Sequence, residues 1–133
     1  MKFKIVPIAG DASLRTFYRI SSKRKSTILV FTQKEKYKNL IAYSAINKFL
    51  RQKKILAPAT YLFNFSKGIM IIEDFGNLSF NKVISNNKNK LKVYKKLIDL
   101  LIKIQKINPK TRIKKIGKGF YKIDKYSNKY LFK

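Results

Sequence analysis

The beginning of the chain alternates polar and apolar residues. The alternation covers residues 2–8 and 15–20, and a short apolar run follows at 27–31. Alternation with a period of two predicts half-buried strands, and a short apolar run bounded by turns suits a buried strand. Polar turns separate the three segments. The pattern therefore predicts three antiparallel strands joined by tight connections.

Further along, the period changes from strand to helix and back. Residues 37–51 carry a mostly apolar helical face, and strands are expected at 60–65 and 69–75 around the turn Ser66-Lys67-Gly68. Two helices are expected after them, a short one at 78–84 and a longer one at 91–107 that ends before Pro109. The rest is expected to be loop, with another helix beginning near 126–131. The predicted fold class is α+β, with a five-stranded antiparallel sheet and one helix inserted after its third strand.

Length and composition exclude several classes of protein. The chain has 133 residues and no cysteine, so it has neither disulfides nor a thiolate metal site. No apolar run approaches the length of a membrane span, and the N-terminus is too short in its apolar part for a secretory signal. We therefore expect a cytoplasmic protein without a membrane partner.

The formal net charge of +26 does not by itself indicate a nucleic-acid-binding protein. Lysine supplies most of the cations and is spread along the chain, whereas nucleic-acid readers tend to cluster their cations and to use arginine. Such a surface attracts polyanions in a salt-dependent way. A small basic protein that binds RNA or DNA on its sheet stays open as the alternative, although specific nucleic-acid binding is not favoured.

The first chemical motif is AGDASLRTFYRI, residues 9–20. Its turn, Gly10-Asp11-Ala12-Ser13, is built of small residues that let backbone N–H groups approach an anion. Because side chains alternate along a strand, Arg15, Phe17 and Arg19 share one face of the second strand. An ordinary glycine hairpin, with both arginines solvated on the outer face of the sheet, is the competing interpretation.

The second motif is GIMIIEDFGN, residues 68–77. Its acidic segment, Glu73-Asp74-Phe75, joins the last predicted strand to the helical part of the chain. Asp74 could cap the helix that follows, though Asn77 is closer to the start of that helix.

Together, in this order and spacing, the two motifs resemble the kinase family that includes the aminoglycoside phosphotransferases. The likeness is closest to its bacterial anomeric kinases of N-acetylmuramate and N-acetylglucosamine, and it runs from about residue 6 to about residue 107. It implies a protein-kinase-like small lobe at 1–76, followed at 77–133 by the first helices of an incomplete large lobe. It also implies ATP and Mg²⁺ as cofactors and a sugar or aminoglycoside as the phosphoryl acceptor.

The resemblance also assigns a nucleotide site. Gly10, Asp11, Ala12 and Ser13 would cover the phosphates, Arg15 could reach a phosphate, and Phe17 would cover the adenine. Backbone groups of the segment Glu73-Asp74-Phe75 would pair with the adenine edge.

Two departures from the family pattern limit the expected activity. Phe31 stands where a phosphate-pairing lysine is expected, with Lys34 just beyond, and the helix at 37–51 has no glutamate to pair with it. The family's H-x-D-x-x-x-x-N catalytic loop is absent, and the six acidic residues form no Mg²⁺-binding set. No catalytic or metal-binding residue is therefore assigned. We expect a truncated chain that is inactive alone and lacks its C-terminal lobe.

Overall fold

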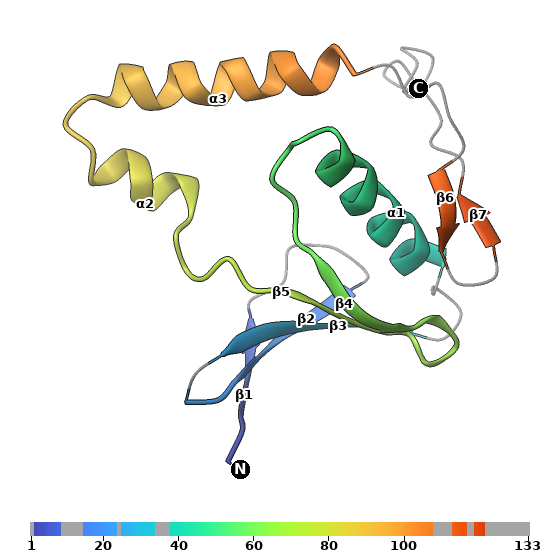
Figure 1. Cartoon of the computed structure of the whole chain (residues 1–133). Coiled ribbons are helices and arrows are strands. Elements are labelled where there is room, and N and C mark those ends of the chain that lie inside the picture. The colour runs from blue at the N-terminus through green and yellow to red at the C-terminus, as the bar shows by residue number, and fades with distance from the viewer. Residues whose placement is uncertain are drawn as a thin grey trace, which may run out of the picture. The chain divides into compact units, whose positions relative to one another are not determined.

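The computed structural model describes residues 2–8, 15–23, 25–33, 38–107, 113–116 and 119–121 (Figure 1). These residues belong to two compact units. The first comprises Met1–Asp74 and Thr111–Tyr126, and the second comprises Phe75–Lys110 and Ser127–Lys133. The sequence division at 76/77 lies two residues from the observed break after Asp74.

The first unit is built on a five-stranded antiparallel sheet with the order β1-β2-β3-β5-β4. Its strands are β1 Lys4–Ile8, β2 Arg15–Ser21, β3 Ser26–Thr32, β4 Thr60–Asn64 and β5 Ile69–Glu73. Each corresponds to a strand expected from the pattern of polar and apolar residues and turns. The α+β class and the five-stranded antiparallel sheet are therefore confirmed.

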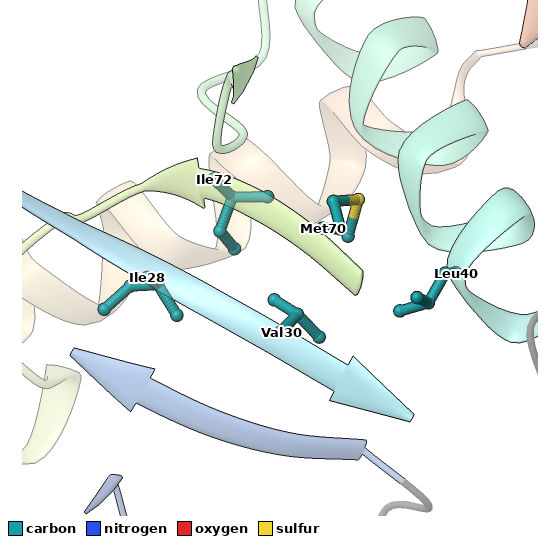
Figure 2. Packing of buried hydrophobic residues seen from close by; sticks show 5 residues of the cluster. All are labelled: Ile28, Val30, Leu40, Met70 and Ile72. Carbon is teal, nitrogen blue, oxygen red and sulfur yellow. The ribbon is translucent and has the colours of Figure 1, made fainter. Parts of the chain in front are cut away.

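One face of this sheet is covered by the helix α1, Lys38–Gln52 (Figure 1). On β3, Ile28, Val30 and Thr32 are buried, whereas Phe31 between them is 40% exposed. Leu40 of α1 is fully buried in the same cluster as Val30. Figure 2 shows this packing, in which the members are Ile28, Val30, Leu40, Met70 and Ile72. The strand period of two thus sorts β3 into a buried face and an outer face.

The connection from β4 to β5 is a short 3-10 turn, Phe65–Lys67, that ends at Gly68. Gly68 has φ of 66°, a left-handed conformation that glycine adopts without strain. Its carbonyl accepts a hydrogen bond of 2.9 Å from the N–H of Thr32. The expected turn at 66–68 is confirmed. Its Gly68 is hydrogen-bonded to Thr32, the last residue of β3.

The second unit contains the helices α2, Phe80–Ser85, and α3, Lys90–Gln105. The side chain of Ser79 caps α2 by accepting from the N–H of Lys82, so the expectation that Asp74 or Asn77 caps this helix is wrong. Asn89 caps α3 in the same way through the N–H of Lys92. Among the described residues, no helix combines the length and apolarity that a membrane crossing requires.

The expectation of a loop after α3 is wrong. Residues Ile113–Ile116 form β6, Gly119–Tyr121 form β7, and the two strands pair in antiparallel fashion. Both lie against α1 in the first unit, although the sequence division placed them in the second. Strands of four and three residues are too short to give a periodic signal. The helix expected near residues 126–131 lies outside the described residues.

Candidate functional site

The small-residue turn of the first motif, Gly10-Asp11-Ala12-Ser13, lies outside the described residues. It connects β1 to β2, which are neighbours in the sheet, with Ile8 opposite Phe17. The strands on either side of the proposed phosphate loop therefore pair as a hairpin.

Arg15, Phe17 and Arg19 lie on the face of the sheet that α1 covers. Their cross-strand partners on β3 are Thr32, Val30 and Ile28, all three of which are buried on that face. Phe17 is half-buried against the core cluster. The three side chains share one face as expected. The interpretation that both arginines are solvated on the outer face is wrong.

Arg15 lies over an aromatic ring of α1. Its guanidinium carbon is 5.0 Å from the centre of the Tyr43 ring, which is within the range of a cation–π interaction. Arg15 is the first described residue after the turn of the first motif. The contact with Tyr43 therefore holds a cation beside the end of that turn.

Arg19 and Asp74 form a bidentate ion pair in the first unit. Nε of Arg19 donates to Oδ2 of Asp74 at 2.7 Å, and Nη2 donates to Oδ1 at 2.9 Å. The hydroxyl of Ser26 also donates to Oδ2 at 2.7 Å. The side chain of Asp74 is only 2% exposed. A buried carboxylate is tolerable because a bidentate guanidinium and a hydroxyl replace its water.

The side chain of Glu73 is also bound within the protein. Its carboxylate accepts from the N–H of Ala59 at 3.0 Å and from Nη1 of Arg51 at 3.4 Å. The N–H of Glu73 donates in turn to the carbonyl of Ala59 at 2.9 Å. Both acidic side chains of the second motif are bonded within the protein, which leaves the main chain of this segment for recognition of a ligand. Phe75, which is 48% exposed, begins the second unit.

The third strand carries no cation on its buried face. Phe31, the position expected to hold a phosphate-pairing lysine in the family, lies on the outer face, while its neighbours Val30 and Thr32 face α1. Lys34 lies outside the described residues. Within the part of the chain that the structure describes, no three carboxylate or histidine side chains gather as a metal site.

Sequence reasoning missed both anchors of the acidic segment. The alternation predicts that Arg19 shares a face with Arg15 and Phe17, but it gives no sign of Asp74, which lies 55 residues away. Arg51 lies 22 residues before Glu73. No local pattern connects residues at such separations, and the alternation of β2 indicated only that Arg19 shares a face with Arg15 and Phe17.

No model of a known protein family matches the chain, and a search of curated proteins finds no significantly similar sequence.

Proposed function

We propose that this chain is the ATP-binding N-terminal portion of an ATP-dependent phosphotransferase of the sugar or aminoglycoside kinase type. The observation that supports this best is the way the first unit is assembled. An antiparallel sheet in the order β1-β2-β3-β5-β4 carries a helix inserted between β3 and β4, and β5 runs directly into Glu73-Asp74-Phe75. A protein-kinase-like small lobe has this arrangement, so the argument is partly one of fold analogy.

The anchored acidic segment supports the adenine half of the proposal. Adenine recognition needs an extended main chain that offers a donor and an acceptor at fixed positions, next to an apolar surface. The bonds of Asp74 to Arg19 and of Glu73 to Ala59 hold this main chain against the sheet. Phe17, in a row with Val30 and Met70 across three strands, supplies the apolar surface.

The phosphate half of the proposal rests on the turn at residues 10–13 and on Arg15. In the proposed complex the turn covers the phosphates with backbone N–H groups, and Arg15 contributes the cation that the third strand lacks. Mg²⁺ and the sugar or aminoglycoside acceptor require carboxylates and a catalytic loop whose motif this sequence does not contain. The chain therefore contributes nucleotide binding rather than catalysis, in a kinase of the cytoplasm.

A comparison of three ligands by NMR tests this proposal. ATP, GTP and inorganic triphosphate are titrated separately at about 0.3 M salt, where attraction to the general positive charge is strongly screened. We expect ATP to shift the amide signals of Glu73 and Phe75 and those of residues 10–13. Triphosphate should shift only the signals of residues 10–13 and Arg15, and GTP should have a weaker effect at Phe75, because its base edge presents a different donor and acceptor pattern.

Two outcomes would contradict the proposal. Equal responses to ATP and triphosphate at every residue would leave only a basic surface. Shifts scattered over lysines, with RNA bound more tightly than ATP at the same salt, would favour the alternative of a small nucleic-acid-binding protein.

A further inference from the structure

The first unit contains a hollow that the proposed nucleotide site does not use. It has a volume of about 740 Å³ and lies between the C-terminal half of α1, the segment at 54–59, and β4. Its lining includes Ser44, Lys48, Ile55, Pro58 and Phe63. A volume of this size falls within the range of small-molecule sites in proteins.

Contacts within the first unit fix the apolar residues of the lining. Ile55 is only 5% exposed, and its N–H donates to the carbonyl of Leu50 at 2.9 Å. The ring of Phe63 stacks on that of Phe65 with 4.5 Å between the ring centres. A ligand therefore meets preformed apolar surfaces, which lowers the entropy cost of binding.

All charged side chains that line the hollow are positive. Lys48, Arg51 and Lys54 line the hollow, and none of its lining residues is acidic. Nη1 of Arg51 already donates to the carbonyl of Ala57 at 2.9 Å and to Glu73. These bonds hold Arg51 at the wall, while Lys48 and Lys54 are exposed and offer positive charge that a ligand can meet.

We propose that this hollow binds a small organic anion with an apolar body, with the anionic group at Lys48 and the body over Ile55 and Phe63. The chemistry of the lining selects this class because a purely polar anion would leave the apolar wall exposed to water. An uncharged apolar molecule would gain nothing from Lys48. The inference stands independently of the proposed nucleotide binding.

The hollow shares two wall residues with the anchor of the acidic segment. Arg51 and Ala59 line it, and both hold the carboxylate of Glu73. A molecule bound in the hollow therefore alters the surroundings of Glu73, and the amide signal of Glu73 reports its arrival.

The test uses two fluorescent probes with the same rings. The sulfonate 8-anilinonaphthalene-1-sulfonate is the anionic probe, N-phenyl-1-naphthylamine is its uncharged analogue, and inorganic sulfate supplies the charge alone. At about 0.3 M salt, which screens the general positive charge, we expect saturable binding of the sulfonate. Amide shifts should fall at Ile55, Ala59, Thr60 and Glu73. The uncharged probe should bind about two- to fivefold more weakly, and sulfate should shift none of these signals.

Two matched variants separate the site from the total charge. Lys48→Glu and Lys4→Glu change the net charge equally, and both side chains are exposed, but only Lys48 lines the hollow. Lys48→Glu should weaken the sulfonate about three- to tenfold and leave the uncharged probe within about twofold, whereas Lys4→Glu should change neither beyond about twofold. Equal weakening by both variants, shifts outside the lining, or matching shifts with sulfate would overturn the proposal.

Discussion

Arg19 and Asp74 form a bidentate ion pair across the first unit, with N–O distances of 2.7 Å and 2.9 Å. Arg19 lies on β2, and Asp74 directly follows the last residue of β5. Ser26, at the start of β3, donates to the same carboxylate. The side chain of Asp74 thereby connects the segment after β5 to β2 and β3. Substitution of Asp74 therefore tests the stability of the first unit and the position of this segment.

Replacing Asp74 with alanine should lower the free energy of unfolding of the first unit by about 3–5 kcal/mol, because it leaves the guanidinium of Arg19 without its counter-charge. The change can be measured by urea denaturation, with amide hydrogen exchange in β3 and β5 as a local readout. Asp99→Ala on α3 is the matched control, since Asp99 is exposed, and it should cost less than about 0.5 kcal/mol. Equal losses in the two variants would contradict a structural role for the pair.

Two glycines with positive φ should respond differently to alanine. Gly68 has φ of 66° and Gly76 has φ of 78°, so both variants incur the same backbone strain. A Cβ at Gly68 would collide with the carbonyl oxygen of Thr32, whereas a Cβ at Gly76 meets nothing within 4 Å. Gly68→Ala should therefore lose about 1–3 kcal/mol more stability than Gly76→Ala in urea denaturation. Similar losses would mean that the turn does not lie against β3.

The core of the first unit can be tested with two leucines. Leu40 is fully buried between α1 and the sheet, whereas Leu56, also in the first unit, is 80% exposed. Leu40→Ala should lower the free energy of unfolding by about 2–5 kcal/mol through lost burial and a residual cavity. Leu56→Ala should change it by less than about 0.5 kcal/mol. Thermal and urea denaturation measure both, and a neutral Leu40→Ala would show that α1 does not pack on the sheet.

The chain alone should show no phosphotransfer. With ATP and Mg²⁺, we expect no product above background from N-acetylmuramate, N-acetylglucosamine or an aminoglycoside, because the sequence lacks the catalytic loop motif. Product formation is measured by mass spectrometry of the acceptor, with a heat-denatured sample as the control. Turnover that is abolished by changing one of the six acidic residues would show that a catalytic site exists in this chain.

Part of the candidate site could be predicted and part could not. The alternation of β2 placed Arg15, Phe17 and Arg19 on one face, and the register with β3 confirms that placement. The partners of that face could not be predicted, because Tyr43 and Asp74 come from elements far along the chain. Nor did the sequence indicate that Phe31 faces outward, since an unbroken apolar run such as residues 27–31 does not show which of its positions are buried.

By itself, the sequence determined the order and type of the elements in the sheet. Hydrophobic periodicity is a local property, so it was sufficient for five strands, α1 and the turn that ends at Gly68. The tertiary structure alone decided that β3 pairs with β5, that β6 and β7 lie against α1, and that the side chains of Glu73 and Asp74 bind within the protein. These features depend on contacts between residues that are distant in the chain. Such contacts form, and contribute to stability, only when the whole unit is packed.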